Sequence, residues 1–113
     1  MSNDLFPVTE GGKKIQLPFI RIKCFYAKRT YTIVDTLDNR QYLKCWYIGK
    51  IARFVKHSKL FFKADKSTLV NTVYVNWEQA EYPHCPLIDG NHLKVARRNK
   101  NAFKKLLPVT NTG

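Results

Sequence analysis

Histidine, cysteine and acidic side chains, the groups that most often carry catalysis or bind metals, are scattered along this sequence. No acid stands at motif spacing to any of the three histidines, so the sequence offers no general base with a residue to orient it. The spacing of His84, Cys85 and His92 matches no standard zinc site, and adjacent residues rarely bind one ion. The three cysteines form no CxxC pair, which predicts buried free thiols rather than disulfides. We therefore expect no enzyme, no metal and no cofactor.

Basic residues, by contrast, are numerous and separated from the acids. The chain has 20 Lys and Arg against 8 Asp and Glu, a formal net charge of +12. Residues 11–34, 39–64 and 90–113 contain no acid and hold six, seven and six basic residues. If the fold lays these segments side by side, they form a positive surface that suits a polyanion such as a nucleic acid. The alternative is a generally cationic soluble protein, although solubility alone does not require so large an imbalance.

The length and composition predict one soluble domain. The chain has 113 residues, 44% of them hydrophobic, which is enough material for a single core and argues against disorder. No apolar run approaches the length of a membrane span, and the N-terminus has no signal-peptide pattern. We expect a cytoplasmic protein with a flexible arm at 1–12, a domain at 13–107 and a tail at 108–113.

Alternating apolar residues predict short strands, and two segments with helical spacing predict short helices. The strands are expected on either side of a kink at Pro18, in a hairpin around Asp38-Asn39, and over 60–63, 69–77 and 93–95. One helix is expected over 46–57, and a basic helix over 97–107 that Pro108 closes. The fold class is therefore mainly β with two short helices.

Three of these segments also follow a familiar order. Residues 31–44 (YTIVDTLDNRQYLK) give a strand, a turn and a strand before the first helix. Residues 59–75 (KLFFKADKSTLVNTVYV) give a Phe-rich strand, a polar loop with Ser, and a Val-Asn pair. Residues 87–107 (LIDGNHLKVARRNKNAFKKLL) give a turn, a short strand and a basic helix. Together they resemble the LytTR family, the DNA-binding domain of bacterial response regulators of the LytR, AlgR and AgrA type, over about residues 13–107.

The resemblance implies an elongated stack of small antiparallel sheets that binds duplex DNA from one edge, with loops that enter successive major grooves. By motif position, the first loop is Lys28, Arg29, Thr30 and Tyr31, the second is Ala64, Asp65, Lys66 and Ser67, and the third is Arg97, Arg98 and Asn99. Lys28, Arg29, Lys66 and Ser67 suit contacts to phosphates or base edges, or else form ordinary solvated turns. Lys100, with Lys104 and Lys105, is expected to form a positive helix face that strengthens binding without reading sequence.

The two adjacent arginines suggest a division of roles in the third loop. A guanidinium fork can bind guanine O6 and N7, which is worth about 1–3 kcal/mol of discrimination. Because neighbours at a strand-to-helix turn point in different directions, we expect Arg98 to read a base and Arg97 to bind phosphate or pack on the sheet. Asn99 either pairs with adenine or caps the helix that follows.

The chain departs from the family pattern at three positions. Asp65 stands where the second loop usually opens with His, and it repels phosphate unless it pairs with Lys66 or accepts from a cytosine amino group. Ala96 replaces the usual Ser before the Arg and so lacks a hydroxyl for phosphate binding or capping. Tyr31 stands where some members have His. DNA binding is therefore expected, but with base preferences of this chain's own.

The interpretation favoured by these patterns is a sequence-specific duplex-DNA-binding transcriptional regulator that stands alone without a receiver domain, since about 12 residues precede the domain. Family members commonly bind paired repeats, so we expect two copies on one DNA site, a weak homodimer or a separate regulatory partner, and no membrane. One alternative is a basic RNA or single-strand binder of small-barrel type with aromatic stacking, although core packing explains the aromatic residues better. Another is a small metal-dependent nuclease that uses Asp65 or Glu78 with a histidine.

Overall fold

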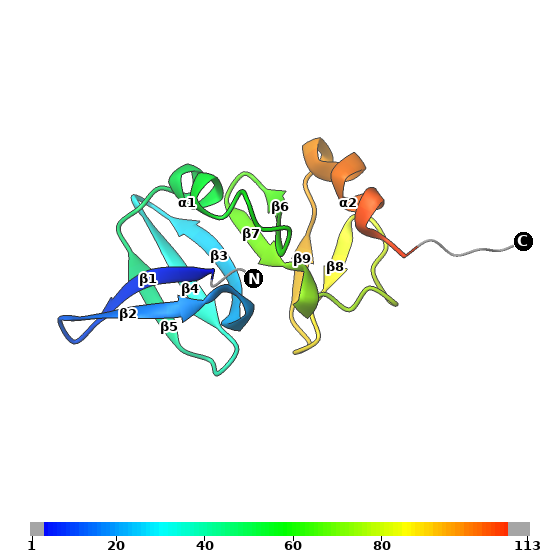
Figure 1. Ribbon diagram of the computed structural model, residues 1–113. Helices are drawn as coiled ribbons and strands as arrows, with labels where there is room; N and C mark the ends of the chain where they lie inside the picture. The colour runs from blue at the N-terminus through cyan, green and yellow to red at the C-terminus, as the bar shows by residue number, and fades with distance from the viewer. Residues whose placement is uncertain (1–3, 109–113) are drawn as a thin grey trace, which may run out of the picture.

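The computed structural model describes residues 4–108 and arranges them as three small antiparallel sheets with two short helices (Figure 1). The central sheet has the order β5 (Gln41–Lys44), β4 (Tyr31–Thr36), β3 (Ile22–Lys28), β7 (Thr68–Asn71) and β6 (Phe61–Asp65). The two hairpins are β1 (Leu5–Glu10) with β2 (Lys13–Pro18), and β8 (His84–Pro86) with β9 (His92–Lys94). The helices are α1 (Ile48–Phe54) and α2 (Lys100–Leu106), with single 3-10 turns η1 (Phe19–Arg21), η2 (Thr72–Tyr74) and η3 (Arg97–Asn99). The expected mainly β fold with two short helices is confirmed.

The central sheet carries a hydrophobic cluster on each face, because neighbouring residues of a strand point to opposite sides. Phe25 and Leu69 lie in the first cluster, which β1, β2 and α1 cover. Cys24 and Val70, one position away in the same strands, lie in the second cluster. Cys85 of β8, Val95 just before η3 and Phe103 of α2 also belong to this cluster. The two clusters explain the elongated outline in Figure 1, with the β1–β2 hairpin at one end and the β8–β9 hairpin and α2 at the other.

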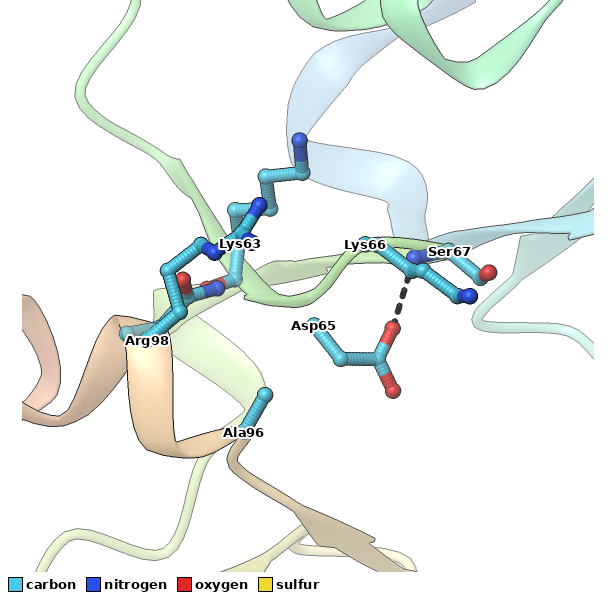
Figure 2. Close-up of a pocket in the computed structure, with 7 residues that line it drawn as sticks. Lys63, Asp65, Lys66, Ser67, Ala96 and Arg98 are labelled. Carbon is cyan, nitrogen blue, oxygen red and sulfur yellow. Dashed lines mark hydrogen bonds between the residues drawn. The ribbon is translucent and has the colours of Figure 1, made fainter.

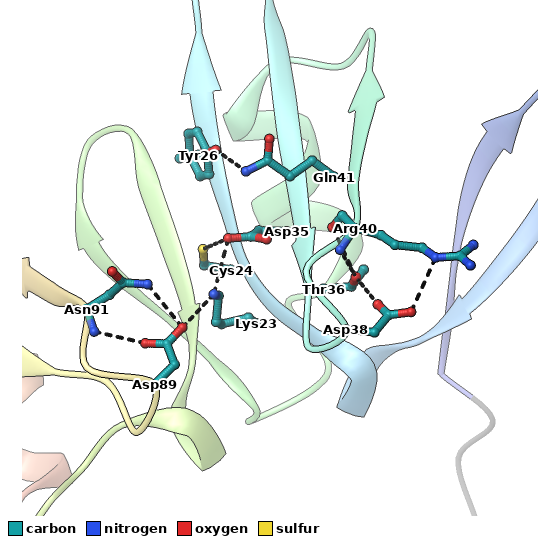
Figure 3. A network of polar contacts seen from close by, with 10 residues as sticks. All are labelled: Lys23, Cys24, Tyr26, Asp35, Thr36, Asp38, Arg40, Gln41, Asp89 and Asn91. Carbon is teal, nitrogen blue, oxygen red and sulfur yellow. Dashed lines mark hydrogen bonds and ion pairs between the residues drawn. The ribbon is translucent and has the colours of Figure 1, made fainter.

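A β-bulge at Lys23 connects the two parts of the fold. Ile22 and Cys24 pair with consecutive residues of β4, so Lys23 is the extra residue of β3. A bulge can re-aim a side chain, and here the Lys23 ammonium lies 2.6 Å from Asp89, in the β8–β9 turn, and 3.4 Å from Asp35 of β4 (Figure 3). This ion pair holds the β8–β9 hairpin against the central sheet.

The expected flexible arm is wrong for residues 5–10, which form β1. Phe6 and Val8 are buried in the first cluster, and β1 pairs along its whole length with β2. Pro7 is tolerated because β1 pairs with β2 alone and is therefore an edge strand. Residues 1–3 of the expected arm and 109–113 of the expected tail lie outside the described residues.

Other element boundaries also differ from the expected ones. The first helix is shorter than 46–57, and the segment 97–107 divides into η3 and α2. The strand expected over 69–77 ends at Asn71, whose side chain accepts the Val73 N–H (2.9 Å) and donates to the Ile22 carbonyl (2.9 Å). Asn71 therefore ends the strand, starts η2 and ties β7 to β3. Within residues 4–108, no helix is long and apolar enough to cross a membrane.

Candidate nucleic-acid interface

The β6–β7 turn, which contains the second predicted loop, lies between the other two loops and is hydrogen-bonded to both sides. Ala27, at the end of β3, donates its backbone N–H to the Ser67 carbonyl (2.8 Å), which keeps the β3–β4 turn beside it. Ala96 donates its backbone N–H to the Ala64 carbonyl (2.8 Å), which keeps the start of η3 on the other side. The structure therefore brings residues 28–31, 64–67 and 97–99 to one edge, which we call the loop edge.

The second and third loops enclose an open hollow of about 470 Å³ on this edge. It is lined by Lys63, Asp65, Lys66, Ser67, Ala96, Arg98 and Asn99. Figure 2 shows Lys63 and Arg98 lying together on one side of the hollow, with Lys66 and Ser67 on the other. Arg98 lines the hollow whereas Arg97 does not, so the two adjacent arginines occupy different surroundings.

The cations of the loop edge have no acidic partner among the residues that the structure describes. The ion pairs within 4–108 join Lys23 to Asp35 and Asp89, Arg40 to Glu10 and Asp38, and His57 to Asp4. None of them includes Lys63 or a residue of the loop edge. The lysines and arginines of this edge are therefore not neutralised by ion pairs, which favours an anionic ligand there.

The first loop is a tight turn with a basic tip. Lys28 pairs directly with Tyr31, which leaves Arg29 and Thr30 as the connecting residues. Arg29 has a φ of 60°, a left-handed conformation that costs a residue with a side chain about 1–2 kcal/mol. Lys28, Arg29 and Thr30 are exposed and Tyr31 is half-buried. The turn thus presents two adjacent cations to solvent beside the second loop.

Asn99 does not cap α2, although it directly precedes that helix. Its side-chain amide donates instead to the carbonyl of Lys63 in β6 (2.5 Å), which fixes η3 to the edge of the central sheet. The capping alternative is therefore wrong, and the contact to adenine stays a prediction. Lys100, the first residue of α2, places its ammonium 5.3 Å from the centre of the Tyr82 ring, so the helix start packs on an aromatic side chain.

Asp65 has a structural function in the second loop. Its carboxylate accepts the backbone N–H of Ser67 (2.8 Å), a bond that closes the turn around Lys66 (Figure 2). The acid makes no ion pair with Lys66. It therefore shapes the loop while it adds one negative charge to the hollow.

Aromatic residues lie mostly in the two clusters, as core packing predicts. Phe62, Trp77 and Phe103 pack together in the second cluster with ring centres 5.7–6.2 Å apart. Phe103 is fully buried, so this group anchors α2 and with it η3. Tyr47 is an exception, since it is 73% exposed.

The groups considered for catalysis and metal binding remain dispersed. His57 and Asp4 approach each other (Nε2 to Oδ1, 2.8 Å), a pair that lies 53 positions apart in sequence. Within residues 4–108, no group of three or more His, Cys, Asp or Glu side chains could hold a metal ion. The cysteines are free thiols as predicted, but Cys45 is exposed rather than buried. Burial raises the pKa of Cys24 to about 12 and that of Cys85 to about 11.

Sequence reasoning missed Lys63 as a residue of the candidate interface. The strand alternation from Phe61 to Lys63 indicates an outward side chain but not what lies next to it. Its neighbour Arg98 comes from η3, which the bond between Asn99 and the Lys63 carbonyl holds in place across 36 positions of sequence. Only the tertiary structure brings these two cations together.

Comparison with known proteins gives two findings. The model of the LytTr DNA-binding domain family matches residues 12–108. Among solved structures, the chain is similar to the LytTr DNA-binding domain of a protein described as a methyl-accepting/DNA response regulator from Bacillus cereus, with a TM-score of 0.75 and 18% identity over 96% of this chain and 100% of that chain. That likeness shows a shared fold. Among curated proteins, no sequence matches this chain.

Proposed function

The chain belongs to the LytTR family of DNA-binding domains, and from this membership we propose that it binds a specific duplex DNA sequence through the loop edge and thereby regulates transcription. The observation that carries the proposal is the pair of backbone hydrogen bonds, Ala27 to Ser67 and Ala96 to Ala64, that join the three loops. Loops that lie side by side along one edge can follow a duplex, whose phosphates repeat along its axis.

Within this interface, Arg98 reads a base and Arg97 binds a phosphate. Arg98 lines the hollow beside Lys63 and is held there by η3. Its guanidinium fork binds a base edge that is exposed in the major groove. Such a bidentate contact to guanine discriminates by about 1–3 kcal/mol. Arg97 lies outside the hollow and is exposed, which suits a phosphate contact.

The remaining loop residues supply further contacts along the loop edge. Lys66 and Ser67 face the hollow and reach phosphate or base edges, and Lys28 and Arg29 bind the neighbouring stretch of duplex. Thr30, Tyr31, Asn99 and Lys100 complete the contact surface at its two ends. Two copies bind paired repeats and associate little without DNA.

Salt titration with three polymers tests the proposal. Binding to a duplex selected from a random pool should exceed binding to single-stranded DNA and to RNA of the same sequence. The logarithm of the binding constant should fall against the logarithm of salt concentration with a slope of about −0.9 per phosphate neutralised. Equal affinity for the three polymers would contradict the proposal and favour the basic single-strand or RNA binder.

Two substitutions separate base reading from phosphate binding. Arg98→Ala should relax the preference for the selected sequence by about 1–3 kcal/mol, whereas Lys104→Ala should weaken all duplexes alike. Arg21→Ala is the matched control, because Arg21 is an exposed arginine at the opposite end of β3 from the loop edge. If Arg98→Ala changes specificity no more than Arg21→Ala does, the role assigned to Arg98 is wrong.

A further inference from the structure

Two lysines that belong to none of the three loops converge on one tryptophan. The Lys44 ammonium lies 4.3 Å, and the Lys50 ammonium 4.4 Å, from the centre of the Trp46 ring. Lys44 also lies 5.6 Å from the centre of the Phe6 ring. Lys44 ends β5, Lys50 is in the first turn of α1, and Trp46 lies between them. These contacts hold two positive charges at a defined place on the surface.

This group lies on the same edge as the three loops, next to the first of them. Lys44 pairs with Thr32, the second residue of β4 and the neighbour of Tyr31 in the first loop. The Thr32 hydroxyl donates to the Trp46 carbonyl (2.8 Å), which fixes the chain between β5 and α1 at this end of the sheet. Since β5 lies beyond β4 in the sheet order, Lys44 lies on the side of the first loop that faces away from the second loop.

The electrostatics of the group call for an anion. Neither lysine forms an ion pair with any acid among residues 4–108. Partial burial lowers the pKa of Lys44, and the nearby charge of Lys50 lowers it further. Two cations near each other without a counter-ion repel, and the negative charge of a nearby phosphate relieves that repulsion.

We propose that Lys44, Trp46 and Lys50 form a fourth contact segment, which binds the phosphodiester backbone of the duplex beyond the stretch that the first loop reaches. The inference rests on the proposed function and adds a longer footprint to it. This segment strengthens binding to all sequences without reading bases, because ammonium groups bind phosphate as point charges. The indole ring holds both lysines in place for that contact.

Removal of both charges tests the fourth segment. In Lys44→Gln/Lys50→Gln, affinity for the selected duplex should fall about tenfold or more near ~0.1 M salt, and the salt slope should become shallower by about 1–2. The preference for the selected sequence over a scrambled duplex should stay unchanged. Lys13→Gln/Lys14→Gln is the matched control, since it removes two exposed lysines from the start of β2, in the hairpin that Figure 1 shows projecting away from α1. The control should keep the wild-type salt slope.

Duplex length and fluorescence supply independent readouts. Lengthening the duplex past the first loop should raise wild-type affinity, and the double variant should gain nothing from it. The variant Trp77→Phe leaves Trp46 as the one tryptophan of the sequence, and duplex DNA should change the fluorescence emission of Trp46.

The inference is overturned if the protein binds its selected duplex while Lys44→Gln/Lys50→Gln behaves like the control, or while Trp46 emission stays constant. Failure of the wild-type protein to prefer any duplex is a different result, which overturns the proposed function and this inference with it.

Discussion

Substitution of Lys23 by Met should destabilise the domain by about 2–3 kcal/mol, less than the ~3–5 kcal/mol lost when a fully buried pair is broken. Lys23 is 7% exposed, and its ammonium lies 2.6 Å from Asp89 and 3.4 Å from Asp35 (Figure 3). Met keeps an unbranched side chain that is one atom shorter, and it removes the charge. The two carboxylates are then left facing each other without a cation between the central sheet and the β8–β9 turn.

The magnitude follows from the two distances and from exposure. At an effective dielectric constant of about 20, charges at these separations attract by about 6 and about 5 kcal/mol. Desolvation of the three charged groups offsets most of this attraction. The Asp89 side chain is 35% exposed, so water stabilises its carboxylate after Lys23 is removed and keeps the loss below that of a fully buried pair.

The effect should depend on pH in a defined direction. The hydrogen bond from Lys23 and the backbone N–H of Asn91 hold the pKa of Asp89 below its ordinary value of 3.8. Burial lowers the pKa of Lys23, but the hydrogen bond to Asp89 and the charge of Asp35 outweigh this and raise it above 10.5. The ion pair therefore stabilises the fold between these values. Its contribution is lost as pH falls through the lowered pKa of Asp89 or rises through the raised pKa of Lys23.

Urea unfolding with fluorescence detection measures this loss, because Trp46 lies in the first cluster and Trp77 in the second. Asp89→Asn should cost less in the Lys23→Met background than in the wild-type protein, a coupling expected to be about 1–2 kcal/mol. The reasoning is refuted if the two substitutions add within about 0.5 kcal/mol, or if Lys23→Met leaves the free energy of unfolding unchanged at neutral pH.

Three further substitutions probe single features of the fold and the loop edge. Asn71→Ala should lower the free energy of unfolding by about 2–3 kcal/mol, since it leaves the buried carbonyl of Ile22 and the partly buried N–H of Val73 without their partner, and urea unfolding measures this. Ala96→Ser should stabilise the protein by up to about 1 kcal/mol in the same assay, because no side chain caps η3 and a hydroxyl can do so. Asp65→Asn should raise affinity for every duplex in a salt titration, since Asn keeps an acceptor for the Ser67 N–H but removes a negative charge; unchanged affinity would contradict a phosphate near this loop.

The parts of the fold that follow from local pattern were predictable from the sequence. Alternating apolar residues after Pro18 predicted the strand that is β3, the apolar segment that begins at Leu69 predicted β7, and helical spacing placed α1 near its observed position. β1 was missed because its two buried residues flank Pro7 in a short segment whose pairing with β2 depends on the tertiary structure. The bulge at Lys23 was missed for a related reason, since its partner Asp89 lies 66 positions away and nothing near Lys23 indicates it.

The candidate site was predictable as a set of loops but not as a surface. The order of three motifs identified the loop residues, whereas their meeting on one edge depends on β3 lying next to β7 and on η3 bonding to β6. Both are contacts between residues far apart in sequence, and the spacing of apolar residues along the chain does not predict them. The role of Asn99 illustrates the point, because its side chain donates to the Lys63 carbonyl and thereby helps to form the hollow rather than capping the next residue.

The positions of the acids explain why the unpaired lysines and arginines include those of the loop edge. Acids that pair in the structure bind Lys23, Arg40 and His57, none of which lies on the loop edge. Lys23 and Arg40 are thus paired with acids away from the loop edge, whereas within residues 4–108 the lysines and arginines of the loop edge form no ion pair. Asp65 is the acid within the loop edge, and its negative charge opposes phosphate binding. Its carboxylate also accepts the Ser67 N–H and so shapes the second loop. Substituting this residue therefore separates loop geometry from charge, the two properties on which recognition by this edge depends.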